Sequence, residues 1–314
     1  CRMCDAGALG YGGNLDADEM LAQVRQVLAD NHGLDAAVHL KLKIHFARMG
    51  EPALNPEVLK ALIHLGRHSG WPGLVPSVST VAPKSPAVEP FFEQLIAVKR
   101  DFFGGGRFQL QFSVHSTDEA QRRRLVPVRT WTLEEIAAYG ERFVRPGDRK
   151  ITLNFAAPPG APLDAAVVER VFRPDRFLVK ITPVNPTETS DRRGTSRLWN
   201  EAPEDVARFA AGLESAGFRV ILSPSLPEEI AAETSCGQLW SGALKRRARI
   251  LLESQEKDRA GAVTAATLAG RAEAWSAALA GQRRRGQPPR PEKAALLVVD
   301  MQGFFLDPAS PAYL

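Results

Sequence analysis

The 314-residue sequence has little cysteine and no long apolar run. Its three cysteines, Cys1, Cys4 and Cys236, are too few and too far apart for a disulfide framework, so we expect a reducing, cytoplasmic environment. No stretch reaches the roughly 18 apolar residues that cross a bilayer, and no signal peptide is visible, so we expect no membrane partner. The first residue is not Met, and we expect the chain to be a fragment of a longer protein.

Apolar residues make up 44% of the chain, which is enough to bury the core of one large domain plus something smaller. The formal net charge of +4 favours an anionic partner such as RNA only slightly. Basic residues gather in three runs, and each run is either a solvated helical face, the commoner case, or a nucleic-acid contact. These runs are Arg122-Arg123-Arg124, Lys245-Arg246-Arg247 and Arg283-Arg284-Arg285.

Helical and strand periodicities alternate from residue 17 to about residue 230. Helices are predicted over 17–29, 56–66, 88–98, 132–144, 162–171 and 203–216. Strands are predicted over 38–46, 74–80, 108–114, 150–155, 176–183 and 218–222. Six strands separated by helices indicate parallel pairing with right-handed crossovers. The fold class is therefore α/β, either an open doubly wound sheet or a partial (β/α) barrel.

Polar motifs follow the ends of several predicted strands, and ligands bind at the carboxyl ends of strands in such folds. Periodicity alone does not require the motifs to lie at strand ends. Their common placement there therefore predicts that they belong to one active site. The motif residues are Gly50, Glu51, Ser79, Ser113, Val114, His115 and Asn185.

The C-terminal part has a different character. Residues 238–281 are predicted to be helical, and 282–291, rich in Arg and Pro, are predicted to form a linker. A continuous apolar strand then ends in Asp300, as a buried parallel strand that opens a new α/β domain would. We therefore divide the chain into a core over 1–243, a helical connector and linker over 244–291, and the start of a further domain over 292–314.

Cys1 and Cys4 form a Cys-x-x-Cys motif, whose two thiolates can reach one centre from a single turn. By itself the motif fits a zinc site or redox chemistry as well as an iron–sulfur cluster. The residues downstream favour the iron–sulfur cluster.

The ordered set of motifs resembles the radical S-adenosylmethionine (SAM) adenosine C2/C8 methyltransferases of large-subunit ribosomal RNA. The resemblance covers residues 1 to about 243 and implies a TIM-like partial (β/α) barrel with a [4Fe–4S] cluster. Cys1 and Cys4 match the second and third ligands of Cys-x-x-x-Cys-x-x-Cys, and the first ligand would lie outside this sequence. The matching segments are Cys4–Gly7, Gly10–Glu19, Met49–Pro52, Val78–Thr80, Ser113–His115, Leu125–Pro127, Asn185–Pro186 and Cys236–Leu239.

The resemblance also assigns the SAM site. Gly50 and Glu51 would bind the amino group of SAM, where a carboxylate makes a charge-assisted contact. The carboxylate, ribose and adenine of SAM would be held by Ser79, Ser113, Val114, His115 and Asn185. Taken singly, these residues have structural explanations: a Gly-Glu-Pro turn, capping serines and a core histidine.

Cys236 is the residue on which structural and functional interpretations differ most. A lone cysteine is usually a small buried hydrophobic residue. Here it matches the family's methyl carrier, which one SAM methylates and which then loses a hydrogen atom to the 5′-deoxyadenosyl radical from another SAM. The resulting carbon radical adds to adenine, and a second cysteine, outside this sequence, resolves the adduct. The implied partners are rRNA or tRNA and an electron donor such as flavodoxin or ferredoxin.

One segment departs from the family pattern. The family usually has an Arg and a Gly-Asp-Asp-Ile before its Ala-Cys-Gly-Gln-Leu, whereas this chain has Ser223–Ile230 and two extra residues before Cys236. This segment should border the substrate, so the methyl acceptor is either RNA or a related small molecule.

The C-terminal strand, with Asp300-Met301-Gln302, is similar to the start of isochorismatase-like cysteine hydrolases. Asp300 would then be the first member of an Asp-Lys-Cys triad, whose Lys and Cys would lie beyond Leu314. A plain buried strand is the structural alternative. The rival functional hypothesis is an isochorismatase-like hydrolase that acts on a small molecule and is fused to a radical-SAM module.

Overall fold

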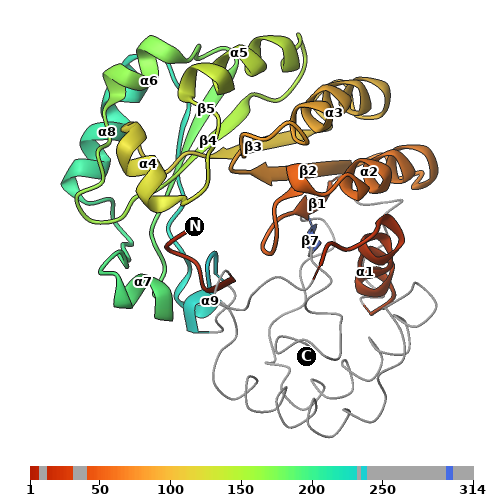
Figure 1. Ribbon diagram of the computed structural model, residues 1–314, viewed down its shortest axis with the longest axis horizontal. Helices are drawn as coiled ribbons and strands as arrows, with labels where there is room; N and C mark the ends of the chain where they lie inside the picture. Colours follow the sequence, from red (N-terminus) through yellow and green to blue (C-terminus); the bar gives the residue numbers. More distant parts are fainter. Residues whose placement is uncertain (7–12, 31–40, 232–234, 239–294, 300–314) are drawn as a thin grey trace, which may run out of the picture. The chain divides into compact units, whose positions relative to one another are not determined.

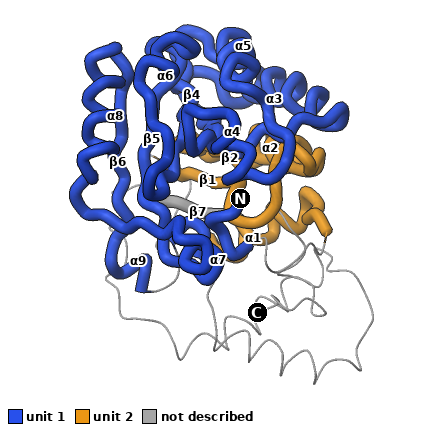
Figure 2. Tube along the Cα trace, turned by 60° about the vertical axis from the view of Figure 1, so that its left-hand side comes forward, with its two compact units in different colours: residues 1–10, 78–240 blue, residues 11–77, 241–314 orange. Residues whose placement is uncertain are grey.

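The computed structural model describes residues 1–6, 13–30, 41–231, 235–238 and 295–299. By its contacts the chain divides into two compact units, shown in different colours in Figure 2. Unit 1 comprises Cys1–Gly10 and Val78–Trp240, and unit 2 comprises Tyr11–Ser77 and Ser241–Leu314.

Unit 1 is built on parallel strands. Its strand order is β6-β5-β4-β3, followed by the last residues of β2, and the three pairings from β3 to β6 are parallel. The strands are β2 (Leu74–Thr80), β3 (Gln109–Ser113), β4 (Ile151–Ala156), β5 (Phe177–Thr182) and β6 (Val220–Leu222). The predicted helices between them are present as α3 (Glu89–Phe102), α5 (Leu133–Phe143), α6 (Ala165–Val171) and α8 (Glu204–Ser215).

Helices α5, α6 and α8 lie side by side along one face of β4 and β5 (Figure 1). The first five residues of β4 are all buried, so both faces of this strand are covered, as is typical of parallel sheets. Gly140 lets α5 approach the sheet closely, because a Cβ at this position would lie 2.2 Å from Cζ of Phe177 in β5. The aromatic rings of Phe92, Phe112 and Tyr139 pack α3 and α5 onto β3.

Unit 2 contains α1 (Ala17–Asp30), β1 (Leu42–Phe46), a 3-10 turn η2 (Pro52–Leu54), α2 (Glu57–His68), the start of β2 and β7 (Ala295–Val299). A capping box begins α1: the Glu19 N–H donates to Asp16 Oδ1 and the Asp16 N–H donates to Glu19 Oε2, both at 2.8 Å. Strand β1 alternates buried and half-buried residues, and α2 packs against α1.

The predicted α/β class with parallel strands is confirmed, and the repeated strand–helix order is consistent with the predicted partial barrel. All six helices and six strands predicted between residues 17 and 230 overlap observed elements, although residues 38–40 of the first strand lie outside the described residues. The sequence did not predict three short helices, α4 (Glu119–Leu125), α7 (Glu188–Arg192) and α9 (Pro227–Ala231).

The predicted C-terminal strand is present as β7, which pairs in parallel with β1 in the register Leu42 to Ala295. Its observed partner is a strand of unit 2, and the expectation that this strand opens a further domain stays a prediction. Asp300 and the connector over 244–291 lie outside the described residues. None of the helices in the described part of the chain has the length and apolar character of a membrane span.

Candidate functional site

Cys1 and Cys4 lie at the two ends of one turn, which we call the cysteine turn. In it the Cys4 N–H donates to the Cys1 carbonyl oxygen at 3.3 Å. Cys1 is exposed, Cys4 is half-buried, and neither thiol is in a disulfide. The turn is anchored between these cysteines: the Arg2 N–H donates to the Leu125 carbonyl at 2.7 Å, and Met3 is buried in an apolar cluster with Leu125. The anchoring leaves both thiols available to one centre.

This turn fits part of a metal site. Two thiols on one turn can bind a single iron–sulfur cluster or zinc ion. Within the described residues, no group of three His, Cys, Asp or Glu side chains could hold a metal ion. The predicted cluster takes a further cysteine from outside this sequence, so the two thiols match the part of the ligand set that this chain is expected to supply.

Asp5, the residue after Cys4, connects this turn to two distant segments. Its Oδ1 accepts the Thr189 N–H at 2.9 Å and its Oδ2 accepts the Glu188 N–H at 3.2 Å, at the start of α7. Its own N–H donates to the Gly237 carbonyl at 3.0 Å. No local sequence pattern signals this role, because the partners of Asp5 are more than 180 residues away.

The Asn185-Pro186 motif lies in the turn between β5 and α7, which we call the Asn185 turn. Thr187 and Ser190 make a capping box at the start of α7, with both backbone-to-hydroxyl distances at 2.8 Å. Asn185 is buried, and its Nδ2 donates to the Cys236 carbonyl at 3.0 Å. Asn185 Oδ1 is also buried and has no hydrogen-bond partner among the described residues. A buried acceptor without a partner is unusual and suits a ligand that donates a hydrogen bond.

Residues 235–238 form a short loop, which we call the Cys236 loop. The Gln238 N–H donates to the Ser235 carbonyl at 3.1 Å, and the Gln238 side chain donates to the Pro186 carbonyl at 3.1 Å. Ser235 and Gln238 are buried, whereas Cys236 is exposed and outside any disulfide. The structure therefore contradicts the alternative in which Cys236 is buried core packing.

Gly237 permits the close fit of this loop against the cysteine turn. Its φ is +84°, and a Cβ at this position would lie 3.1 Å from the Met3 carbonyl oxygen and 3.7 Å from Cys4 Cα. The loop is thus hydrogen-bonded to the Asn185 turn and to Asp5, which follows the cysteine turn, and Asp5 is hydrogen-bonded to the start of α7. Within unit 1, the structure brings together three of the motifs that the sequence singled out. Figure 1 shows the N-terminal segment, in red, near α7 and α9.

His115 follows the end of β3 and is buried, with a φ of +67°. Its Nδ1 accepts the Ala156 N–H at 3.1 Å, and its own N–H donates to the Asn154 carbonyl at 3.2 Å. Burial lowers the pKa of His115 to about 3, and the positive charge of Arg122 acts in the same direction. The ring is therefore neutral, with its proton on Nε2.

The remaining predicted ligand residues lie on both units. In unit 1, Ser113 ends β3, Val114 donates its N–H to the Asn154 carbonyl at 2.8 Å, and Ser79 is half-buried on β2. In unit 2, Gly50 has a φ of +79° and Glu51 caps η2, its Oε1 accepting the Ala53 N–H at 3.0 Å. Locally, Gly50 and Glu51 therefore form the turn that was the structural explanation of this motif. Their role in binding SAM stays a prediction.

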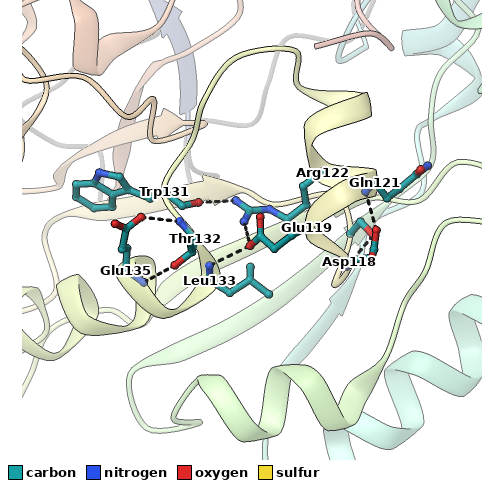
Figure 3. A network of polar contacts seen from close by, with 9 residues as sticks. Asp118, Glu119, Gln121, Arg122, Trp131, Thr132, Leu133 and Glu135 are labelled. Carbon is teal, nitrogen blue, oxygen red and sulfur yellow. Dashed lines mark hydrogen bonds and ion pairs between the residues drawn. The ribbon is translucent and has the colours of Figure 1, made fainter.

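The Arg122-Arg123-Arg124 run, read as a solvated face or an RNA contact, is divided in the structure. Arg123 and Arg124 are exposed, but Arg122 is buried. Figure 3 shows Arg122 donating to Glu119 at 2.6 Å and to the Trp131 carbonyl at 3.1 Å, while Glu119 also accepts the Leu133 N–H. The network ties α4 to the start of α5.

The segment that departs from the family pattern continues from β6 into α9. The Ser223 N–H donates to the Ile181 carbonyl at 3.0 Å, and the Ile230 carbonyl accepts a 3.4 Å hydrogen bond from the Gln238 side chain. Leu226 between them is exposed. The altered segment is therefore tied at its far end to the Cys236 loop, as expected of a segment that borders the same site.

No protein-family model matches the chain. Curated relatives do match it, and all of those described here are named as RNA methyltransferases. The dual-specificity RNA methyltransferase RlmN of Sorangium cellulosum is 29% identical over 246 residues, covering 76% of this chain and 58% of the relative. A probable RlmN of Desulfitobacterium hafniense is 31% identical over 247 residues, covering 76% of this chain and 63% of the relative.

The ribosomal RNA large subunit methyltransferase Cfr of Bacillus velezensis is 28% identical over 260 residues, covering 79% of this chain and 67% of the relative. The chain thus spans about three fifths of the length of the first relatives it matches. None of these names supports the isochorismatase-like hydrolase. Over about three quarters of its length, the chain is similar to enzymes named as methyltransferases of RNA.

Proposed function

We propose that this chain is the main part of a radical SAM enzyme that methylates a ring carbon of adenosine in RNA. The names of the relatives and the colinear motifs support ribosomal RNA as the acceptor. The partial barrel would carry the site at the carboxyl ends of its strands.

The convergence of three distant segments carries this proposal. The cysteine turn, the Asn185 turn and the Cys236 loop are tied together by hydrogen bonds of 2.9 to 3.2 Å. A methyl carrier must lie near the cofactor and also be reachable by a macromolecular substrate. An exposed thiol on a loop anchored to the cysteine turn meets both requirements.

Cys1 and Cys4, with a cysteine from outside this sequence, would hold the [4Fe–4S] cluster. When bound, and supplied with electrons by a flavodoxin or ferredoxin, the cluster provides the reductive cleavage of SAM. Gly50 and Glu51 would bind the SAM ammonium group through a charge-assisted contact. The buried acceptor Asn185 Oδ1 and the Nε2–H of neutral His115 would bind polar groups of SAM, together with Ser79, Ser113 and Val114.

Cys236 would accept a methyl group from SAM and pass it to the adenine ring. The thiolate is a good nucleophile for this first transfer. A ring carbon that bears hydrogen is not itself nucleophilic, so direct polar transfer from SAM to that carbon is unfavourable. A covalent carrier divides this difficult step into two easier ones.

The test is peptide mass spectrometry of the full-length protein produced with SAM, beside a methyl-transfer assay on total RNA. We expect a methyl mass increment on the peptide that contains Cys236, methylated adenosine in the RNA, and neither in Cys236→Ser. Ser differs from Cys by one atom and the position is exposed, so Cys236→Ser should fold like the wild type. Its folding is checked as the control. Unmodified Cys236 in active enzyme, or normal methylation by Cys236→Ser, contradicts the carrier role.

A further inference from the structure

Asp5 is a buried carboxylate that has no cationic partner among the residues the structure describes. Only 7% of the residue is exposed, and no Lys or Arg in the described part of the chain pairs with it. A buried carboxylate is costly unless hydrogen bonds satisfy it. Here the N–H groups of Glu188 and Thr189 each donate to a different carboxylate oxygen. These charge-assisted bonds give Asp5 a fixed orientation that an uncharged side chain would hold less strongly.

Asp5 also lies at the junction of the three segments. It directly follows Cys4 in the chain, its N–H binds the Gly237 carbonyl, and its carboxylate binds the start of α7. The loop is bound in turn to the Asn185 turn through Asn185 Nδ2 and the Gln238 side chain. A displacement of Asp5 would therefore move Cys4 relative to Cys236, because Asp5 is joined to Cys4 through the backbone and to α7 through its carboxylate.

We propose that Asp5 is a positioning residue that fixes the Cys236 loop relative to the cysteine turn. The chemical consequence rests on the proposed function: a methylated Cys236 would have to stay at a set distance from SAM, whose cleavage the cluster held by Cys1 and Cys4 would supply, for its hydrogen atom to be abstracted. A carrier that drifts from this distance leaves SAM cleavage intact but reduces its use for methylation.

The first test uses the full-length protein without cluster or SAM. Asp5→Asn removes one acceptor and turns an amide NH₂ towards a backbone N–H, while the volume of the side chain stays nearly constant. We expect faster hydrogen exchange at Glu188 and Thr189, and also in the Cys236 loop, with a several-fold change in the rate at which iodoacetamide alkylates Cys236.

The matched control is Asp164→Asn. Asp164 also caps a helix of unit 1, accepting the Ala166 N–H at 2.9 Å at the start of α6. The Asp164→Asn variant should alter hydrogen exchange in α6 and leave the alkylation rate of Cys236 unchanged. If Asp5→Asn affects only Glu188 and Thr189 and leaves the Cys236 loop unchanged, Asp5 is merely a helix cap and the proposal fails.

The second test measures the molecules of 5′-deoxyadenosine formed per methyl group transferred by the reconstituted full-length enzyme. We expect this ratio to rise several-fold in Asp5→Asn at unchanged iron content. Gly237→Ala presses a Cβ against the Met3 carbonyl without changing the Asp5 side chain. It should also raise this ratio, and it replaces Asp5→Asn as the test variant if Asp5→Asn does not fold. An unchanged ratio in both variants overturns the positioning role. If the wild-type protein methylates nothing while the first test succeeds, the proposed function fails and the structural link stands.

Discussion

At the scale of single residues, exposure separates the two candidate roles of Cys236. A cysteine kept for packing is normally buried, yet Cys236 is exposed between the buried residues Ser235 and Gln238. The loop is held by backbone atoms and by the side chains of its neighbours, and its thiol makes no disulfide. The sequence motif predicts this residue as the carrier, and its exposure agrees with a group that must meet a substrate.

His115 gives a prediction about pH. Its folded-state pKa of about 3 lies below the ordinary 6.5, so between these values the unfolded chain binds a proton that the folded chain does not. Stability is therefore complete above pH 6.5 and is lost as the pH falls towards 3. We expect His115 to account for a loss of about 2 kcal/mol in the free energy of unfolding between pH 7.5 and pH 5.

Chemical denaturation of wild type and His115→Asn at a series of pH values measures this loss. Asn tolerates the positive φ at this position and offers an oxygen in place of Nδ1. The variant should lack that part of the pH dependence, whereas His68→Asn, at an exposed position of α2, should retain it. Equal pH profiles for wild type and His115→Asn would contradict the buried neutral histidine.

At the scale of elements, periodicity predicted what long helices and buried strands need and missed what depends on distant partners. Five of the six predicted helices, α1, α2, α3, α5 and α8, have 11 to 14 residues and carry an apolar face over several turns, so their sequences reveal them. Helix α7 has five residues, and its first two N–H groups donate hydrogen bonds to Asp5, more than 180 residues away. Helix α4 depends on an Asp118 cap and on the Glu119–Arg122 network. No local pattern encodes the contacts of α7 with Asp5, whereas the Asp118 cap and the Glu119–Arg122 pair are local and α4 is too short for an apolar periodicity to reveal it.

The three consecutive arginines of α4 provide a prediction with its controls built in. Arg122→Ala removes a buried guanidinium that binds Glu119 and the Trp131 carbonyl, so we expect the free energy of unfolding to fall by about 2–3 kcal/mol. Arg123→Ala and Arg124→Ala, at exposed positions, should each change it by less than about 0.5 kcal/mol. Urea denaturation of the three variants is the measurement, and equal effects would show that the network of Figure 3 does not stabilise the fold.

At the scale of the whole molecule, the sequence predicted the α/β class and the convergence of the cysteine turn, Asn185 and Cys236. It did not predict the division into two units, because the contacts that define a compact unit join segments far apart in the chain. Unit 1 takes in residues 1–10 together with 78–240, and unit 2 joins 11–77 with β7. Of the predicted SAM ligands, Gly50 and Glu51 belong to unit 2 and the others to unit 1.

SAM affinity tests that predicted ligand set. We expect Glu51→Gln and Asn185→Ala each to weaken SAM binding by about 1–3 kcal/mol, roughly 5- to 150-fold, because each leaves a polar group of the ligand without its partner. Gln keeps an acceptor for the Ala53 N–H and so preserves the η2 cap while removing the charge that would face the ammonium group. Glu57→Gln, which alters an exposed ion pair with Lys60 at the start of α2, is the control and should leave affinity unchanged. Calorimetric titration of SAM into the reconstituted full-length protein measures all three. Wild-type affinity in folded Glu51→Gln would remove unit 2 from the ligand set, and wild-type affinity in Asn185→Ala would leave the buried acceptor Oδ1 without its predicted ligand.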